Sequence, residues 1–207
     1  MLRSFRSGWL SVSAALTILT IVVSFSVSYF ANHQLFSTVT MPVLRSCGGT
    51  AFDDIRNLEL WRVITAQLIH AKQVHMLLNA LCLFLLGSLV ESRVGGLLTF
   101  SIGLIAGGIA TAISPILIEA PWNVGTGASQ ATFAFAGCAT VLALSGTLKR
   151  KLTWTLIAFV VLPGVTLDLI YAGYPKPGHV VGFVLRMIFR GLYLKPRNTG
   201  CRFSQNS

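Results

Sequence analysis

Two short stretches, far apart in the chain, decide how this protein folds and what chemistry it could carry. The first reads Gly125-Thr-Gly-Ala-Ser-Gln-Ala-Thr-Phe-Ala-Phe-Ala-Gly137, and the second reads Pro177-Gly-His-Val-Val-Gly182. Each opens an apolar run, and each places one reactive side chain, Ser129 or His179, beside very small residues. Because small residues let helix backbones approach closely inside a membrane, we expect these two helices to meet and Ser129 to reach His179.

The composition indicates a membrane protein. Of the 207 residues, 54% are hydrophobic and only 11% are charged, whereas soluble domains carry about 25% charged residues. So few charges cannot cover a soluble surface, and lipid must therefore be part of the solvent. The formal net charge of +10 does not indicate a nucleic-acid partner, because the basic residues cluster at the ends of apolar runs, as orientation signals do. We therefore expect a lipid bilayer, and no nucleic acid, among the partners.

The apolar runs predict an all-α membrane protein with six transmembrane helices, since about 20 residues span a bilayer as a helix. The runs cover roughly 9–30, 74–90, 96–118, 128–147, 152–172 and 178–194 of a single domain, 1–207. A large outer loop joins the first two runs. Most Lys and Arg fall on one side if the N-terminus is inside, which favours cytoplasmic N- and C-termini. We expect the fourth helix to be enclosed by the others, because its small residues suit packing on several sides.

This topology places reactive side chains from three helices at one depth in the membrane. The second, fourth and sixth predicted helices enter from the same outer side, and their first one or two turns hold His75, Asn79, Ser129 and His179. Polar groups at membrane depth are costly and usually functional. His179 could take the proton of the Ser129 hydroxyl and return it to a leaving amine. The backbone N–H of Ser129, with Asn79 and His75, could stabilise a negatively charged carbonyl oxygen.

Five sequence elements follow one another along the chain: Glu59-Leu-Trp61-Arg62, His70 followed by His75-Met-Leu-Leu-Asn79, Gly87-Ser-Leu-Val-Glu91-Ser-Arg93-Val-Gly95, Gly127-Ala-Ser129 and His179-Val-Val-Gly182. Taken in this order, they resemble the motifs of the rhomboid intramembrane serine proteases. The resemblance implies a rhomboid-like bundle and a serine endopeptidase that cleaves transmembrane or membrane-anchored proteins, in a bacterial inner membrane. It also implies that the reaction uses no metal and no cofactor.

The resemblance also assigns roles to individual residues. Ser129 is the expected nucleophile and His179 its base, in a catalytic dyad, while His75, Asn79 and Ser129 form the oxyanion hole. The expected structural supports are Trp61, Arg62, His70, Glu91, Arg93, Gly127 and Gly182. Within this set we expect Trp61 to anchor at the membrane interface, His70 to donate a hydrogen bond that anchors a loop, and Glu91 with Arg93 to tie the inner end of the second helix.

Two positions depart from the family pattern. Gln130 stands where the nucleophile motif, Gly-x-Ser-Gly, usually has its second glycine, and its side chain could either widen the gap between the fourth and sixth helices or supply an extra donor. Arg186 stands where a small residue usually continues the pattern, and we expect it to extend to the inner surface beside Arg190. No Asp or Glu lies in a pattern that completes a triad. Asp168 is interpreted as an interfacial residue, with a part in a moving gate as the alternative.

Other functions stay open on the sequence alone. A proteolytically inactive rhomboid-like protein that binds membrane clients is the main alternative, and Gln130 is its best support. A specialised sorting protease that acts on tagged C-terminal anchors is a second possibility. A transporter or channel has little support, because the sequence contains no inverted repeat and no pair of broken helices.

Overall fold

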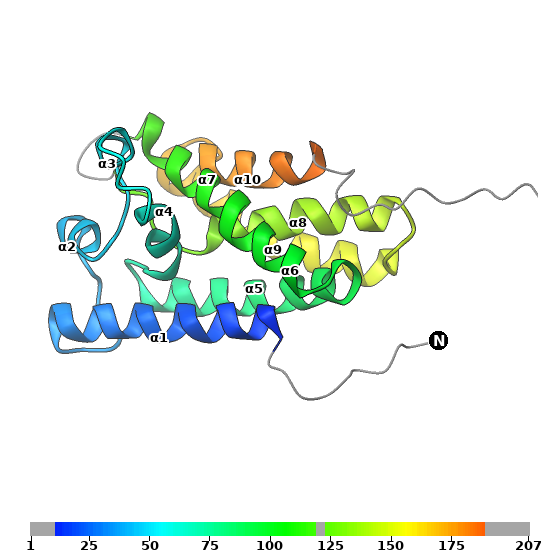
Figure 1. Ribbon diagram of the computed structural model, residues 1–207, viewed down its shortest axis with the longest axis horizontal. Coiled ribbons are helices and arrows are strands. Elements are labelled where there is room, and N and C mark those ends of the chain that lie inside the picture. Colours follow the sequence, from blue (N-terminus) through cyan, green and yellow to red (C-terminus); the bar gives the residue numbers. More distant parts are fainter. Residues whose placement is uncertain (1–10, 119–122, 189–207) are drawn as a thin grey trace, which may run out of the picture.

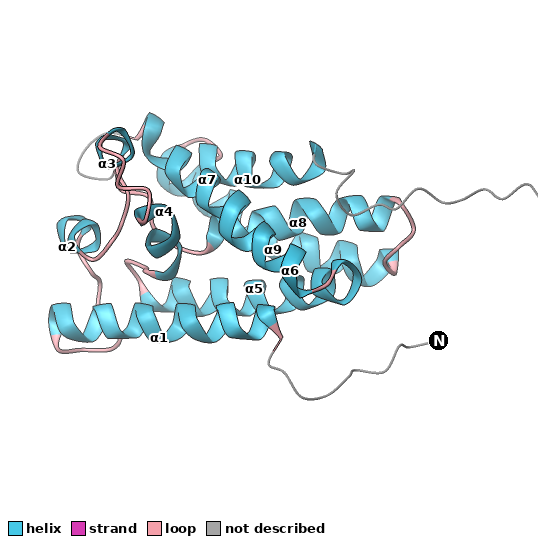
Figure 2. Ribbon diagram, viewed as in Figure 1, coloured by secondary structure: helices cyan, strands magenta, loops and turns pink. Residues whose placement is uncertain are grey.

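The computed structural model describes residues 11–118 and 123–188, and it is a bundle of helices (Figures 1 and 2). Its helices are α1 (Val12–Asn32), α2 (Met41–Ser46), α3 (Phe52–Arg56), α4 (Arg62–Thr65), η1 (Ala66–Leu68), α5 (Gln73–Val94), α6 (Gly96–Ser101), η2 (Ile102–Ala106), α7 (Gly107–Ile113), η3 (Ser114–Leu117), α8 (Ser129–Leu144), α9 (Arg150–Ala172) and α10 (Pro177–Ile188). Extended structure within these ranges is limited to two isolated β-bridges.

Four helical segments of the described ranges are long and apolar enough to cross a bilayer. They are Val12–Asn32, Gln73–Val94, Gly96–Ile116 and Arg150–Ala172. Two shorter apolar helices, α8 and α10, lie where the fourth and sixth spans were predicted. The prediction of an all-α membrane bundle is therefore confirmed, while the number of six spans stays a prediction. The predicted ends of the first and last runs, at residues 9 and 194, lie outside the described residues.

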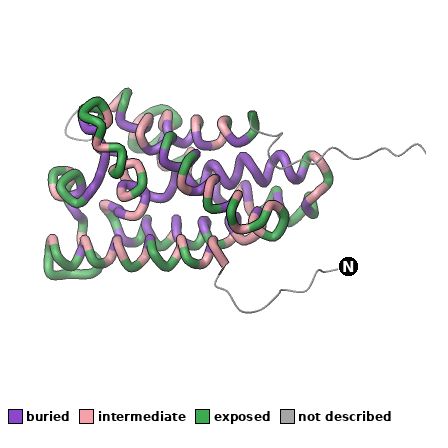
Figure 3. The backbone as a smooth tube through the Cα atoms, viewed as in Figure 1, coloured by how far each residue is buried: buried purple, intermediate pink, exposed green. Residues whose placement is uncertain are grey.

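Helix α8 forms the centre of the bundle, as expected from its small residues. Every residue from Ser129 to Ala143 is buried, and Figure 3 shows this helix as an unbroken buried segment. It packs against α5, α7, α9 and α10. Because Ala, Gly and Thr present little bulk on any side, a helix made largely of them can take neighbours all around, and this enclosure holds its first residue, Ser129, inside the protein.

At two positions, α8 and α10 lie so close together that there is no room for a side chain between them. A Cβ atom on Gly182 of α10 would lie 2.7 Å from the backbone carbonyl oxygen of Gln130 in α8. A Cβ atom on Gly137 of α8 would collide with the backbone carbonyl oxygen of Phe183 in α10. The two glycines therefore let the helix backbones touch directly, which is the close approach predicted from the small residues.

Helix α5 is tied to the start of α1 by Glu91. Its carboxylate accepts the backbone N–H groups of Val12 and Ser13, both at 2.9 Å, and the hydroxyl of Ser13 at 2.6 Å. Helix N-termini leave their first N–H groups without partners and favour negative charge, so a carboxylate from a neighbouring helix stabilises both elements. Glu91 thus contacts α1 at this end of the helix, whereas Arg93 is exposed.

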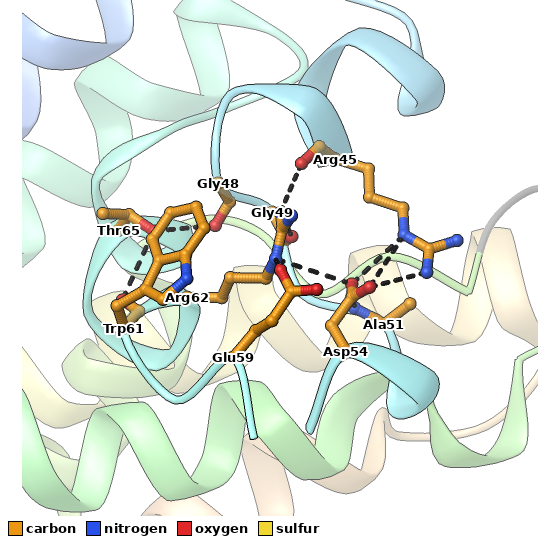
Figure 4. A network of polar contacts seen from close by, with 9 residues as sticks. All are labelled: Arg45, Gly48, Gly49, Ala51, Asp54, Glu59, Trp61, Arg62 and Thr65. Carbon is orange, nitrogen blue, oxygen red and sulfur yellow. Dashed lines mark hydrogen bonds and ion pairs between the residues drawn. The ribbon is translucent and has the colours of Figure 1, made fainter. Parts of the chain in front are cut away.

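The long connection between α1 and α5 folds into short helices held by an ion-pair network (Figure 4). Arg45 Nη2 lies 2.6 Å from Asp54 Oδ1, and Arg62 Nε lies 2.6 Å from Glu59 Oε2. Arg62 also donates to the backbone carbonyls of Arg45 and Gly49. Its guanidinium lies 4.6 Å from the ring of Trp61, a side chain that is 51% exposed. Arg62 therefore links three parts of this loop, and Trp61 is free to contact the membrane interface.

The loop network makes a pH prediction through Asp54. Burial raises the pKa of Asp54, but hydrogen bonds from Arg45 and from the Ala51 N–H, with the charge of Arg62, outweigh it and hold that pKa below its ordinary value. Because the pKa of Asp54 is lower in the folded protein than in the unfolded chain, its charge stabilises the loop at any pH above the unfolded pKa, about 3.9. This contribution is lost as the pH falls through the folded pKa. In the wild type we therefore expect the hydrogen-exchange protection of residues 45–65 to decrease once the pH is lower than about 4.

The matched variants isolate this carboxylate. Asp54→Asn removes the titrating group, so its loop should already be less protected at neutral pH and should show a weaker acid dependence. Asp53→Asn changes an exposed neighbour in the same short helix and should behave like the wild type. If Asp54→Asn and the wild type lose protection over the same pH range and to the same extent, Asp54 does not hold the loop.

Candidate active site

Ser129, His179 and Asp168 form one line of hydrogen bonds across three helices. The Oγ of Ser129, the first residue of α8, lies 2.9 Å from Nε2 of His179 in α10. The Nδ1 of the same imidazole lies 2.6 Å from Oδ2 of Asp168 in α9. All three residues are buried, with 8%, 5% and 2% of their surfaces exposed. The structure thus brings Ser129 and His179 together as expected and adds a carboxylate behind the imidazole.

The interpretation of Asp168 as an interfacial residue is wrong, because this side chain faces the bundle. It lies one turn before the end of α9, and the short connection to α10 places it against the start of that helix. A signal was present in the sequence: Thr153, Gly164 and Asp168 recur at helical spacing. Small and polar residues on one stripe of an otherwise apolar helix indicate the stripe that packs on neighbouring helices.

The backbone ahead of Ser129 is fixed by the long loop. Gly127 has a φ of +97°, a conformation that favours glycine, and its N–H donates to the carbonyl of Ala66 at 2.8 Å. The N–H of Ala128 donates to Nε2 of His70 at 3.1 Å, and a Cβ atom on Gly127 would lie 3.3 Å from the same ring. The turn before Ser129 is therefore packed and hydrogen-bonded against His70.

His70 acts as an acceptor here, which corrects the expectation that it donates the anchoring bond. Burial lowers the pKa of His70 to about 3, with a further contribution from the nearby ring of His75, while the carbonyl of Leu68 opposes the shift. The ring is consequently neutral at physiological pH. Since its Nε2 accepts the Ala128 N–H, the single ring proton sits on Nδ1.

The imidazole of His179 is oriented by stacking as well as by hydrogen bonds. The ring of Phe133 lies parallel to it, with centroids 4.3 Å apart and planes 7° apart. Phe133 is in turn confined by Gly164 of α9, where a Cβ atom would lie 2.7 Å from the phenyl ring. Packing from α8 and α9 therefore limits how far the ring of His179 can tilt.

The expected oxyanion donors lie on α5 and at the start of α8. Asn79 is buried, and its side-chain Nδ2 has no hydrogen-bond partner in the part of the chain that the structure describes. His75 lies one turn earlier on α5, is exposed, and its ring centroid is 6.2 Å from that of His70. A buried amide without a partner is costly, and a group that arrives only with the substrate would remove this cost.

Gln130 does not hold the helices apart. Its backbone carbonyl, not its side chain, faces Gly182, and the contact between Ser129 and His179 is formed with the glutamine present. The side chain turns toward Ser129 instead: its Oε1 lies 3.1 Å from the Ser129 hydroxyl, and its Nε2 lies 3.4 Å from the hydroxyl of Ser114. Of the two expectations for this position, widening of the gap is therefore contradicted.

Arg186 does not extend to the inner surface, which corrects a second expectation. It is 5% exposed, and its Nη2 donates to the carbonyl of Ser101 at 3.2 Å. The reason is its helical position: Gly178, His179, Gly182 and Arg186 are the buried residues of α10, so all four share the face that meets the bundle. Arg190, expected beside it, lies outside the described residues.

Comparisons with known proteins identify the family of this chain. The family model of the Rhomboid domain matches residues 57–196. The chain is 29% identical over 132 residues to Rhomboid-like protease 3 of Toxoplasma gondii, a match that covers 62% of this chain and 45% of that protein. It is 26% identical over 147 residues to RHOMBOID-like protein 7 of Arabidopsis thaliana, covering 70% of this chain and 46% of the relative.

A second plant relative, RHOMBOID-like protein 4 of Arabidopsis thaliana, is 26% identical over 131 residues, which cover 62% of this chain and 33% of that protein. The chain thus matches less than half the length of each of these relatives. The family model alone covers well over half of the chain and includes Ser129, Asp168 and His179. The chain is a multi-pass integral membrane protein and belongs to the rhomboid family.

Proposed function

We propose that this protein is an intramembrane serine endopeptidase that cleaves transmembrane or membrane-anchored proteins. The observation that carries the proposal is the contact between Ser129 Oγ and His179 Nε2, 2.9 Å long and buried between two apolar helices. A nucleophile and a base within hydrogen-bond distance are the core of serine hydrolase chemistry. Membership of the rhomboid family supports the proposal, as does the name protease carried by the Toxoplasma relative.

The proposed reaction has two halves. As Ser129 Oγ attacks the carbonyl carbon of the scissile peptide bond, its proton passes to Nε2 of His179 and the carbonyl π pair moves onto oxygen. The tetrahedral intermediate then collapses, the C–N bond breaks, and Nε2 returns the proton to the leaving amine. Water next attacks the acyl-enzyme while His179 takes its proton, and collapse frees the new carboxyl end and restores the Ser129 hydroxyl.

The negative charge on the carbonyl oxygen needs hydrogen-bond donors during both halves. We assign this role to the Ser129 N–H at the start of α8, to Asn79 and to His75. The Nδ2 of Asn79 supports the assignment, because it has no hydrogen-bond partner among the described residues and so is available as a donor. His70 and Gly127 then support the site by fixing the turn that aims Ser129, and Gly182 by holding α10 against α8.

The membrane arrangement follows as part of the same proposal. We propose a single rhomboid-like domain over 1–207, with all six apolar helical segments as spans and with cytoplasmic N- and C-termini in a bacterial inner membrane. The distribution of Lys and Arg supports this orientation. It places the start of α8 and the start of α10 near the outer side, where a substrate segment leaving the bilayer meets both water and the dyad.

One observation favours the alternative, an inactive rhomboid-like protein that binds membrane clients. The Oε1 of Gln130 lies 3.1 Å from the Ser129 hydroxyl and can accept the same proton as His179. A hydroxyl that donates to an amide oxygen is not activated as a nucleophile, because the amide is a far weaker base than imidazole.

A fluorophosphonate probe separates the two functions without knowledge of the substrate. We expect purified protein in detergent to be labelled covalently, and Ser129→Ala to abolish labelling. Ser92→Ala changes an exposed serine of α5 and should label like the wild type. Cleavage of a panel of transmembrane substrates should follow the same order. Folded wild-type protein that resists labelling and cleavage, but binds the substrates as Ser129→Ala does, would favour the inactive relative.

A further inference from the structure

The carboxylate of Asp168 lies where it can determine the orientation and the tautomer of the His179 imidazole. Its Oδ2 lies 2.6 Å from His179 Nδ1, on the opposite side of the ring from Ser129. Asp168 is 2% exposed, so water does not compete strongly for this contact. From this geometry, and resting on the proposed function, we infer that Asp168 is a positioning residue that completes a Ser129–His179–Asp168 triad across α8, α10 and α9.

The remaining contacts of Asp168 suit an ionised carboxylate. The backbone N–H of Lys176 donates to Oδ2 at 2.9 Å, and the Lys176 ammonium lies 3.8 Å from Oδ1. An ionised carboxylate only accepts hydrogen bonds, so the ring nitrogen that faces it must carry a proton. The buried charge is balanced by these partners, as buried charges require.

The consequence for His179 is a choice of tautomer. A neutral imidazole has one N–H and one lone pair, and the hydrogen bond at one nitrogen determines which nitrogen keeps the proton. With Asp168 at Nδ1, the proton stays there and the lone pair of Nε2 faces the Ser129 hydroxyl. When the serine proton arrives on Nε2, the ring becomes positive, and the adjacent carboxylate stabilises that charge in the transition state.

Without the carboxylate, this preference disappears. In Asp168→Leu no acceptor faces Nδ1, and a buried N–H without a partner is costly, so the proton moves to Nε2, where Ser129 Oγ can accept it. A ring in that tautomer can no longer accept from the Ser129 hydroxyl. Stacking against Phe133 does not restore the tautomer with the proton on Nδ1, because a flat apolar ring does not distinguish between the two nitrogens of His179.

Asp168 also has a structural contact that needs a control. By accepting the Lys176 N–H it joins the end of α9 to the start of α10, and anchoring alone could explain a loss of activity on substitution. Anchoring would not determine where the imidazole proton sits. The nitrogen chemical shifts of His179 therefore separate the two roles.

The test combines probe labelling with ¹⁵N NMR of histidine-labelled protein in detergent, at mildly alkaline pH so that the rings are neutral. In the wild type we expect His179 to carry its proton on Nδ1; in Asp168→Leu we expect it on Nε2. We also expect fluorophosphonate labelling of folded Asp168→Leu to fall on the order of 10²–10⁴-fold, by analogy with the loss seen when the triad tautomer is wrong in serine proteases. Lys176→Met removes the ion pair alone and should keep most of the labelling rate.

Three outcomes would overturn the inference. One is a wild-type His179 with its proton on Nε2, which needs no variant and so holds even if Asp168→Leu fails to fold. Another is a folded Asp168→Leu that keeps the wild-type labelling rate or the wild-type tautomer. The last is a Lys176→Met protein that loses as much labelling as Asp168→Leu, because the ion pair, and not the hydrogen bond to His179, would then explain the effect. Absence of any Ser129 labelling in the wild type would instead contradict the proposed protease function, while the tautomer measurement would still decide the role of Asp168.

Discussion

Replacing His179 by alanine is expected to reduce cleavage of a transmembrane substrate to background, a loss on the order of 10⁴–10⁶-fold, and Ser129→Ala is expected to do the same. The two side chains share one hydrogen bond, so under the proposed mechanism either deletion removes the whole nucleophilic pathway. Because they act as one unit, the double variant should be no slower than the single ones. The measurement is cleavage of a model substrate in liposomes, with the three variants compared at equal folded concentration.

The control for this series lies next to the base on the same helix. Val180→Ala shortens a side chain that is 47% exposed on α10, and it should leave cleavage close to the wild-type rate. Thermal melting should show that all variants remain folded, since His179→Ala leaves the glycine contacts of α10 in place. Losses that add in the double variant would mean that Ser129 and His179 contribute independently, and the dyad would be the wrong description.

The meeting of Ser129 and His179 could be predicted because two physical signals agreed. Apolar runs fixed the helices, and small residues at their starts indicated which helices touch. Ala131, Ala134 and Gly137 do lie in a buried helix with α10 against it, and Ala128 caps the start of that helix. Membrane helices carry few polar groups, so two reactive side chains at one depth stand out against the apolar background.

Asp168 and Arg186 could not be placed from depth alone, because depth along a helix does not say which side faces the bundle. Both residues sit near the ends of apolar helices, where charged side chains usually reach toward water. Their burial depends on the rotation of α9 and α10 about their axes, which the packing of Gly164 against Phe133 and of Gly182 against α8 determines. Those contacts exist only once the bundle is assembled.

Gln130 shows a different limit. A bulky residue at a position usually occupied by glycine suggests a clash, yet the clash is avoided because the side chain turns away from Gly182 and toward Ser114. Ser114 belongs to η3, which follows the bent segment α6–η2–α7, and no local pattern connects it with residue 130. Whether the Gln130 side chain helps Ser129 or competes with His179 for its proton therefore depends on tertiary structure.

The second large effect is expected at Gly182, one turn after His179 in α10. The space that a side chain at this position would need is occupied by the backbone carbonyl oxygen of Gln130, which lies 2.7 Å from the ideal Cβ position. The Ala110 methyl group lies 3.4 Å from the same point. A backbone carbonyl inside a buried helix cannot swing aside as a flexible side chain can. Gly182→Val must therefore push α10 away from α8, and a displacement of about 1 Å at a catalytic contact can cost on the order of 10²-fold in rate.

We accordingly expect Gly182→Ala to lower fluorophosphonate labelling of Ser129 and Gly182→Val to lower it further, with a fall in stability of about 1–3 kcal/mol for the larger side chain. Val180→Leu adds bulk to the exposed face of the same helix and should change neither quantity much. Labelling rate and melting temperature distinguish displacement of the base from unfolding, because a folded but slow variant has kept the bundle and lost the contact between Ser129 and His179. If Gly182→Val is folded and is labelled at the wild-type rate, the close approach of α10 to α8 is not what positions the base, and the stacking of His179 on Phe133, together with its bond to Asp168, must be sufficient to hold the ring in place.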